Sequence, residues 1–142
     1  MARLMLRRFQ SDFKTMIEAL FSQTNYIAAK KGMDASGLKQ KAIASNLANV
    51  ETPGYRRVDT APSFNAAFTR ALREGNKQQL ANLQPHVTVD QTAVSKNKDG
   101  NTVDVEQEVV ALNQNALAHK LQAQLISGTL SKLRLAITGR PQ

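Results

Sequence analysis

The sequence predicts a mainly α-helical protein, with long N- and C-terminal helices packed together like a coiled coil and joined by a largely irregular middle segment with a short helix. Apolar residues recur at helical spacing near both ends of the chain, which is the first sign of two long helices. Gln, Asn, Ala and Leu are abundant, a composition that suits long helices better than sheets. Aromatic residues make up 5% of the chain and Trp is absent, so we expect a modest core.

A chain of 142 residues is long enough for one domain. We expect a single domain over residues 16–142. Its parts are an N-terminal helix over 16–50, a turn and irregular middle over 51–101 with a short helix near 63–74, and a C-terminal helix over 102–138. Residues 1–15 are interpreted as a basic extension outside this domain, with Met16 as an alternative start of the native chain.

The N-terminal helix is predicted from apolar side chains such as Ile43, Leu47 and Val50, which are spaced by four and three residues. Gly32 and Gly37 interrupt the pattern, each at a cost of about 1 kcal/mol relative to Ala in a helix. Two interpretations stay open. Either two helices meet at these glycines, or one long helix tolerates them because another backbone approaches closely.

The stretch NLANVETPGY, residues 46–55, ends this helix. Proline disfavours helical backbone at the preceding residue, and Pro-Gly favours a tight type II turn. We therefore expect a turn that redirects the chain. The residues of this turn motif are Asn46, Asn49, Thr52, Pro53, Gly54 and Tyr55.

The middle segment carries weaker patterns. Pro62-Ser63 followed by spaced apolar residues up to Gly75 predicts a short capped amphipathic helix. HVTVDQTAV, residues 86–94, alternates briefly like a strand. Residues 95–106 partly match a calcium-binding loop, but the first position is Ser95 and no helix precedes it, so we interpret them as a turn leading into a capped helix.

The C-terminal helix has the clearest pattern, a seam of residues in 4-3 spacing over more than four heptads. The seam consists of Val105, Val109, Leu112, Ala116, His119, Ala123, Ile126, Leu130, Leu133 and Ile137. Four further apolar residues, Val110, Leu117, Leu121 and Leu125, widen the apolar surface, so we expect more than one neighbour. A helix of this length is about 50 Å long, too long for a compact domain of this size without a partner.

The predicted ends of this helix follow from their residue types. Asp104 with Gln107 is typical of a capping box, and Glu106 and Glu108 suit the positive N-terminal end of a helix. Gly139 is the expected stop.

Nothing in the sequence indicates catalysis. Cys is absent, which excludes thiol chemistry and zinc-thiolate sites, and His86 and His119 are far apart in the chain. No glycine-rich phosphate loop, metal-ligand cluster or nucleophile elbow is present. We therefore expect a protein that is not an enzyme, with no cofactor, no metal and no small-molecule substrate.

The net charge of +8 favours one alternative, a basic helical protein that binds nucleic acid or an anionic membrane surface. The positive charges are scattered, however, and only Tyr55 lies beside an adjacent basic pair as a stacking group. Single-strand binding uses a basic stripe with several aromatics, so we expect no nucleic-acid partner.

Two segments resemble one known family. KAIASNLANVETPGYRR is similar to the N-terminal signature of bacterial flagellar basal-body rod and hook proteins, and DGNTVDVEQEVVALNQNALAHKLQAQLISGTLSKLRLAI resembles their C-terminal helix. Together the two segments cover well over half the chain. Distal-rod and hook relatives carry a large β domain between these segments, whereas the short middle here is similar to the proximal rod type.

The resemblance implies a structural subunit of the proximal rod, which polymerises into the helical tube that transmits motor torque across the periplasm. It implies self-association, contacts with neighbouring rod subunits and with the membrane-ring or rod adaptor proteins, and passage through the flagellar type III export apparatus without a cleavable signal peptide. The basal body, in its periplasmic rod, is the implied location. The residues expected to form the assembly interface are Ile43, Leu47, Val105, Val109, Leu112, Ile126, Leu130, Leu133 and Ile137.

Overall fold

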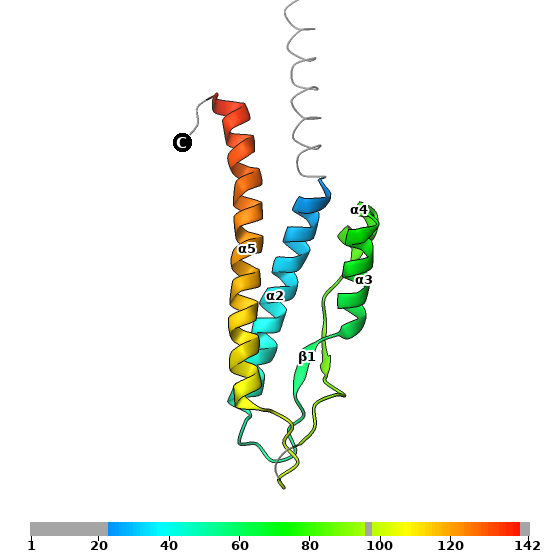
Figure 1. Cartoon of the computed structure of the whole chain (residues 1–142), viewed down its shortest axis with the longest axis vertical. Helices are drawn as coiled ribbons and strands as arrows, with labels where there is room; N and C mark the ends of the chain where they lie inside the picture. The colour runs from blue at the N-terminus through cyan, green and yellow to red at the C-terminus, as the bar shows by residue number, and fades with distance from the viewer. Residues whose placement is uncertain (1–22, 96–97, 140–142) are drawn as a thin grey trace, which may run out of the picture.

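The computed structural model describes residues 23–95 and 98–139. Its elements in chain order are α2 (Thr24–Ala48), β1 (Val58–Thr60), α3 (Pro62–Arg73), α4 (Lys77–Asn82), β2 (Val87–Val89) and α5 (Val105–Thr138). The long helices α2 and α5 lie side by side, and α3, α4 and the two short strands lie on the other side of α2 (Figure 1). The predicted mainly helical fold is confirmed. The expected extension over 1–15 and the expected start of the first helix at residue 16 lie outside the described residues.

α2 is one continuous helix through both glycines, which decides between the two open interpretations. A Cβ atom on Gly32 would lie 2.7 Å from Nε2 of Gln122 in α5, so the group that comes close is a side chain. A Cβ atom on Gly37 would meet nothing within 4 Å in the part of the chain that the structure describes. The expected close approach of another backbone is therefore wrong.

The middle segment is more ordered than expected. The short helix forms as α3 with Pro62 at its first turn, although no side chain caps it. The helix α4 and the strand β1 were not predicted. β2 confirms the brief alternation in the sequence, and it pairs antiparallel with β1 so that Val58 faces Val89 and Thr60 faces Val87.

The apolar core is small. Ala28 of α2, Ala71 of α3 and Leu80 of α4 form its buried centre, with Ile27, Phe68 and Leu83 packed around them. Among the described residues, the largest fully buried side chains are Ile43, Leu80, Glu108 and Asn46, two of which are polar or charged. Much of the interior is therefore held by hydrogen bonds and ion pairs.

The N-cap and the stop predicted for α5 are confirmed, although the helix starts at Val105 rather than at residue 102. The Asp104 carboxylate accepts hydrogen bonds from the backbone N–H groups of Glu106 and Gln107. Gly139 ends the helix in the left-handed conformation, with φ of 65°, and its N–H donates to the Leu135 carbonyl at 2.8 Å. Within the described residues, no helix has the length and apolar character needed to cross a membrane.

Candidate assembly surface and the junction that positions it

The turn after α2 has the geometry that its sequence predicts. The Tyr55 N–H donates to the Thr52 carbonyl at 3.2 Å, which closes a four-residue turn around Pro53 and Gly54. Gly54 has φ of 71°, the positive value that a type II turn requires at its third position. Pro53 and Gly54 are both exposed.

Asn46 lies fully buried at the end of α2 and hydrogen-bonds the chain that leaves the turn. Its Nδ2 donates to the Val58 carbonyl at 2.8 Å, and its Oδ1 accepts from the Val58 N–H at 2.9 Å. The Tyr55 hydroxyl lies 3.4 Å from the same Oδ1 and 3.0 Å from Oγ of Ser45. Asn46 therefore fixes where β1 starts relative to α2.

The other members of the turn motif make shorter-range bonds. Asn49 donates from Nδ2 to the Ser45 carbonyl at 2.8 Å, and Thr52 donates from Oγ1 to Oδ1 of Asn49 at 3.3 Å. The Asn49 side chain therefore binds a carbonyl in the last turn of α2, and Thr52 in turn holds the Asn49 side chain.

Asn101 is the main residue of the junction that sequence reasoning missed. It is 2% exposed, and its Nδ2 lies 2.9 Å from each of the carbonyl oxygens of Asn49, Val50 and Thr52. The Thr102 N–H also donates to the Tyr55 carbonyl at 3.0 Å. The segment that leads into α5 thus closes over the turn that leaves α2. No periodicity signals this contact, since a lone Asn in a turn is usually exposed.

A buried ion cluster ties the first turns of α5 to the same junction. Arg57 donates from Nε to Oε1 of Glu108 at 2.6 Å, from Nη1 to Asp90 at 2.6 Å and from Nη2 to Asp59 at 3.0 Å. Lys39 of α2 pairs with Asp59 at 3.5 Å. Glu108 is fully buried, and its second oxygen has no hydrogen-bond partner among the described residues. Explaining Glu108 only as a favourable charge at a helix start was therefore incomplete.

The charges in this cluster support one another. Burial works against the charge on Arg57, but hydrogen bonds and attraction from Glu108 and Asp59 outweigh it and raise the pKa of the guanidinium. Hydrogen bonds from Thr92 and Arg57 outweigh burial and lower the pKa of Asp90. Burial would raise the pKa of Asp59, but the Thr60 N–H, Lys39 and Arg57 outweigh it and lower the value.

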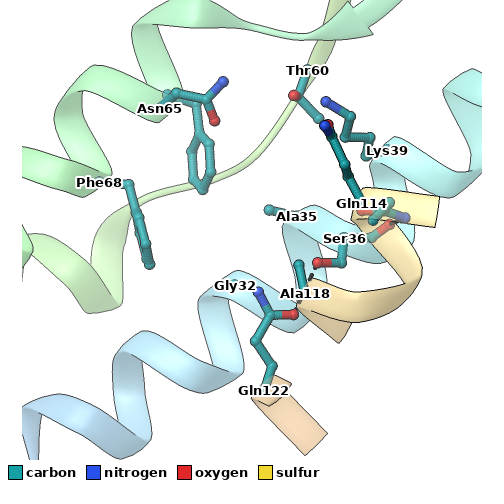
Figure 2. Close-up of a pocket in the computed structure, with 12 residues that line it drawn as sticks. Gly32, Ala35, Ser36, Lys39, Thr60, Asn65, Phe68, Gln114, Ala118 and Gln122 are labelled. Carbon is teal, nitrogen blue, oxygen red and sulfur yellow. Dashed lines mark hydrogen bonds between the residues drawn. The ribbon is translucent and has the colours of Figure 1, made fainter. Parts of the chain in front are cut away.

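Where α2 and α5 meet, the contacts are polar and small. Ser36 donates from Oγ to Oε1 of Gln122 at 2.9 Å, and Asn115 donates from Nδ2 to the Ser36 carbonyl and to Oε1 of Gln40, both at 3.0 Å. Figure 2 shows Gln122 reaching toward α2 at the edge of a hollow of about 300 Å³, with Phe68 of α3 on the other side. The interface within the chain therefore uses the polar face of α5 and leaves much of the 4-3 seam outside it.

The structure separates the residues of the expected assembly interface. Val105, Val109, Leu130 and Ile137 are exposed, and Leu112, Ile126 and Leu133 are half-buried. In α2, Leu47 is half-buried, but Ile43 is only 2% exposed. Ile43 is packed within the chain itself, so its assignment to a surface between copies was wrong.

A second apolar surface lies on the side of α5 that faces away from α2. Because each helical residue turns by about 100°, Val110, Leu117 and Leu135 lie roughly opposite Asn115, and Leu121 and Leu125 continue from them toward one flank of the helix. We call them the outer stripe: Val110, Leu117, Leu121, Leu125 and Leu135, each between 45% and 61% exposed. Large apolar side chains left in solvent along a whole helix mark a surface for protein contacts.

This fold, a polar helix pair held at one end and carrying its apolar side chains outside, defines the class of a helical subunit that packs against other chains. Residues 28–56, the larger part of α2 and the turn, match the family model described as flagella basal body rod protein. The flagellar basal body rod protein FlgB of Borrelia hermsii is 32% identical over 111 residues, covering 66% of this chain and 80% of that protein. The chain belongs to the flagellar basal body rod protein family.

Two further relatives show the same similarity over more of the chain. FlgB of Aquifex aeolicus is 28% identical over 117 residues, covering 80% of this chain and 92% of the relative. FlgB of Bacillus subtilis is 25% identical over 118 residues, covering 78% and 90%. All three relatives are named as rod proteins, so the similarity gives no support to the alternative of a protein that binds nucleic acid or a membrane surface.

Proposed function

We propose that this chain is a non-enzymatic structural subunit of the proximal flagellar rod, and that copies assemble through the apolar surfaces of α5. One observation carries the proposal: α5 contacts α2 partly through the amides of Asn115 and Gln122 and leaves most of its large apolar side chains exposed. The family that the chain belongs to is the second support.

The two apolar surfaces of α5 favour an open assembly. Burying one Leu side chain stabilises a contact by about 1.5–3 kcal/mol, so several along a helix suffice for a specific interface. The outer stripe and the exposed seam residues lie on different sides of α5, which suits contacts with two different neighbours. Contacts between different surfaces that do not close into a ring generate helical filaments, the geometry that a rod requires.

Within this proposal, the turn motif and Asn101 act as positioning residues. They lock the end of α2 to the start of α5, so the two helices share one fixed orientation. The seam residues offered to a neighbour are Val105, Val109, Leu112, Ile126, Leu130, Leu133 and Ile137, together with Leu47 of α2.

The proposal includes the partners and location that the resemblance implies. These are other copies of the chain, neighbouring rod subunits, the membrane-ring or rod adaptor proteins, and the type III export apparatus. The proposed site of action is the periplasmic part of the basal body, reached by export without a cleavable signal peptide. This role needs no cofactor, nucleic acid or small-molecule substrate.

The test places a charge on the seam. Leu130→Asp should abolish incorporation into basal bodies and swimming in a strain that lacks the protein, because a buried unpaired charge is strongly unfavourable. The matched control is Ser131→Asp, which adds the same charge to an exposed polar position next to it and should leave both unchanged. Secretion of both variants should match the parent chain, which separates assembly from export. Normal incorporation of the Leu130→Asp subunit would contradict the proposal.

A further inference from the structure

The segment that leads into α5 contains a chemically labile dipeptide, Asp99-Gly100. Every other Asp of the chain is followed by a residue that carries a side chain, and no Asn is followed by Gly. Glycine has no Cβ, so its backbone nitrogen is unshielded and its torsions are free. The carboxyl carbon of Asp99 can therefore close a five-membered succinimide ring with the Gly100 nitrogen more readily than any other Asp in the chain can with its own successor.

The reaction needs no reagent besides water. The lone pair of the Gly100 nitrogen attacks Cγ of the protonated Asp99 carboxyl group and forms a C–N bond. The Cγ–O bond breaks, and the hydroxyl group leaves as water with the proton from the nitrogen. A water molecule then opens the ring at either carbonyl carbon. Opening at the former backbone carbonyl gives isoaspartate, in which the chain runs through Cβ and Cγ and the former backbone carbonyl group is a free carboxylate.

The folded chain holds the reacting residue by two hydrogen bonds. Oδ1 of Asp99 accepts from the Asn101 N–H at 3.0 Å. The Asp99 backbone carbonyl accepts from the Gly54 N–H at 2.9 Å. Ring closure requires the side chain and the backbone of Asp99 to rotate until Cγ reaches the Gly100 nitrogen. Both hydrogen bonds oppose that rotation.

The surroundings of the dipeptide restrict it further. Asn101, the next residue, is 2% exposed and is held by three backbone carbonyl oxygens of the turn. A Cβ atom on Gly100 would lie 3.8 Å from Cα of Gly54, so the two backbones are close together. Asp99 and Gly100 are themselves exposed. Water is therefore at hand for the reaction as soon as the segment opens, and only the hydrogen bonds of the junction prevent it.

We propose that Asp99-Gly100 is a site of spontaneous isoaspartate formation that the closed junction protects, so that the modification marks chains which have spent time unfolded. This inference goes beyond the proposed function and does not depend on it. Isoaspartate adds one atom to the backbone and moves the oxygen that accepts from the Gly54 N–H. The added atom displaces Asn101 from the carbonyl oxygens of the turn. A modified chain then cannot rebuild the junction.

The first test compares folded and unfolded chains. The purified parent chain is incubated at neutral pH in buffer and in urea, and isoaspartate is located by peptide mapping with electron-transfer fragmentation. Conversion of Asp99 should be at least about tenfold slower in buffer, because only a locally opened minority of folded chains can react. Asp34, an exposed residue of α2 followed by Ala35, is the internal comparison and should convert far more slowly in urea. Equal conversion of Asp99 in buffer and in urea would overturn the proposal.

Two destabilised variants separate local opening from a general loss of stability. Asn101→Ala removes the bonds beside the reacting pair and should raise conversion in buffer toward the rate in urea. Glu108→Ala breaks the buried ion pair but leaves the bonds of Asn101 in place, so its conversion should stay close to that of the parent. Circular dichroism checks that both variants are folded. Equal conversion in the two variants would show that the junction does not protect the site.

The modified chain tests the consequence. Isoaspartyl chains formed in urea are separated from unmodified chains by reversed-phase chromatography, and both are refolded by removing the urea. The modified chain should have a lower unfolding temperature and faster hydrogen exchange at the N–H groups of Thr52 and Tyr55. Equal exchange in the two refolded chains would overturn the claim that isoaspartate prevents the junction from forming.

Discussion

Arg57 and Glu108, 51 residues apart in the sequence, meet in a buried ion pair with 2.6 Å between Nε and Oε1. The pair joins the segment after the turn to the first turn of α5, and Glu108 is fully buried. Since one side of the pair is on α5 and the other leads into β1, the contact holds the two halves of the fold together at the junction.

Glu108→Ala should destabilise the chain by about 3 kcal/mol, because removing one partner of a buried pair leaves the other charge buried and less compensated. Asp59 and Asp90 still compensate part of the Arg57 charge in this variant. The expected loss of stability is therefore at the lower end of the range for broken buried ion pairs. Urea unfolding followed by circular dichroism measures it. Glu106→Ala, at an exposed position two residues away, is the control and should change stability by about 1 kcal/mol or less. Equal losses in the two variants would contradict a structural role for the buried pair.

Asn101→Ala should lower the free energy of unfolding by about 3 kcal/mol, because three backbone carbonyl oxygens at the turn lose their hydrogen-bond donor. Hydrogen exchange should become faster at the turn N–H groups of Thr52 and Tyr55 before it changes in the middle of α2. Asn113→Ala, on the exposed side of α5, provides the comparison and should stay within about 0.5 kcal/mol of the parent. Unchanged exchange at the turn would show that Asn101 does not hold it.

The same substitution at two glycines should have opposite effects. Gly37→Ala should stabilise the chain by about 1 kcal/mol, because α2 is regular there and the new methyl group meets no atom of the described residues within 4 Å. Gly54→Ala should destabilise it by about 1–2 kcal/mol, because its φ of 71° is unfavourable for an L side chain even though space is free. Thermal unfolding of the two variants beside the parent measures both. A change of unfolding temperature in the same direction for both variants would contradict the different backbone roles given to the two glycines.

Acid should weaken the junction. The pKa values of Asp59 and Asp90 lie below the ordinary value of 3.8 in the folded chain, so their stabilisation is present above that value and is lost as pH falls through the lower folded values. At pH values below about 4, the unfolding temperature should decrease. In Asp90→Asn, stability near neutral pH should be lower and the further loss in acid smaller. A parent chain equally stable at about pH 2 and pH 6 would contradict this.

How far the sequence predicts this structure depends on the kind of signal. The C-terminal end of α5, its Asp104 cap and its Gly139 stop follow from local rules, because periodicity and capping act within a few residues. The Thr52–Tyr55 turn is equally local, since Pro53 and Gly54 restrict their own backbone. These elements were predicted correctly.

Contacts across the chain were harder to predict. Sequence reasoning places large apolar side chains inside, yet α5 meets α2 through Asn115 and Gln122, whose amides find partners only once the helices are paired. The pairing of β1 with β2 and the bonds of Asn101 depend on segments far apart in sequence. The buried position of Ile43 follows from the same cause, since the partner of its helix face could not be deduced from spacing alone.

If copies assemble through α5 as proposed, the exposed apolar side chains of that helix make the stability of the subunit depend on its concentration. In the proposed assembly, the exposed apolar side chains of α5 would leave water when a neighbour covers them, so association would contribute free energy that the single chain lacks. By mass action, the fraction of folded chains rises where copies accumulate and falls where they are dilute. A subunit arriving at a growing end, where neighbours are abundant, would therefore complete its folding at the place where it is used.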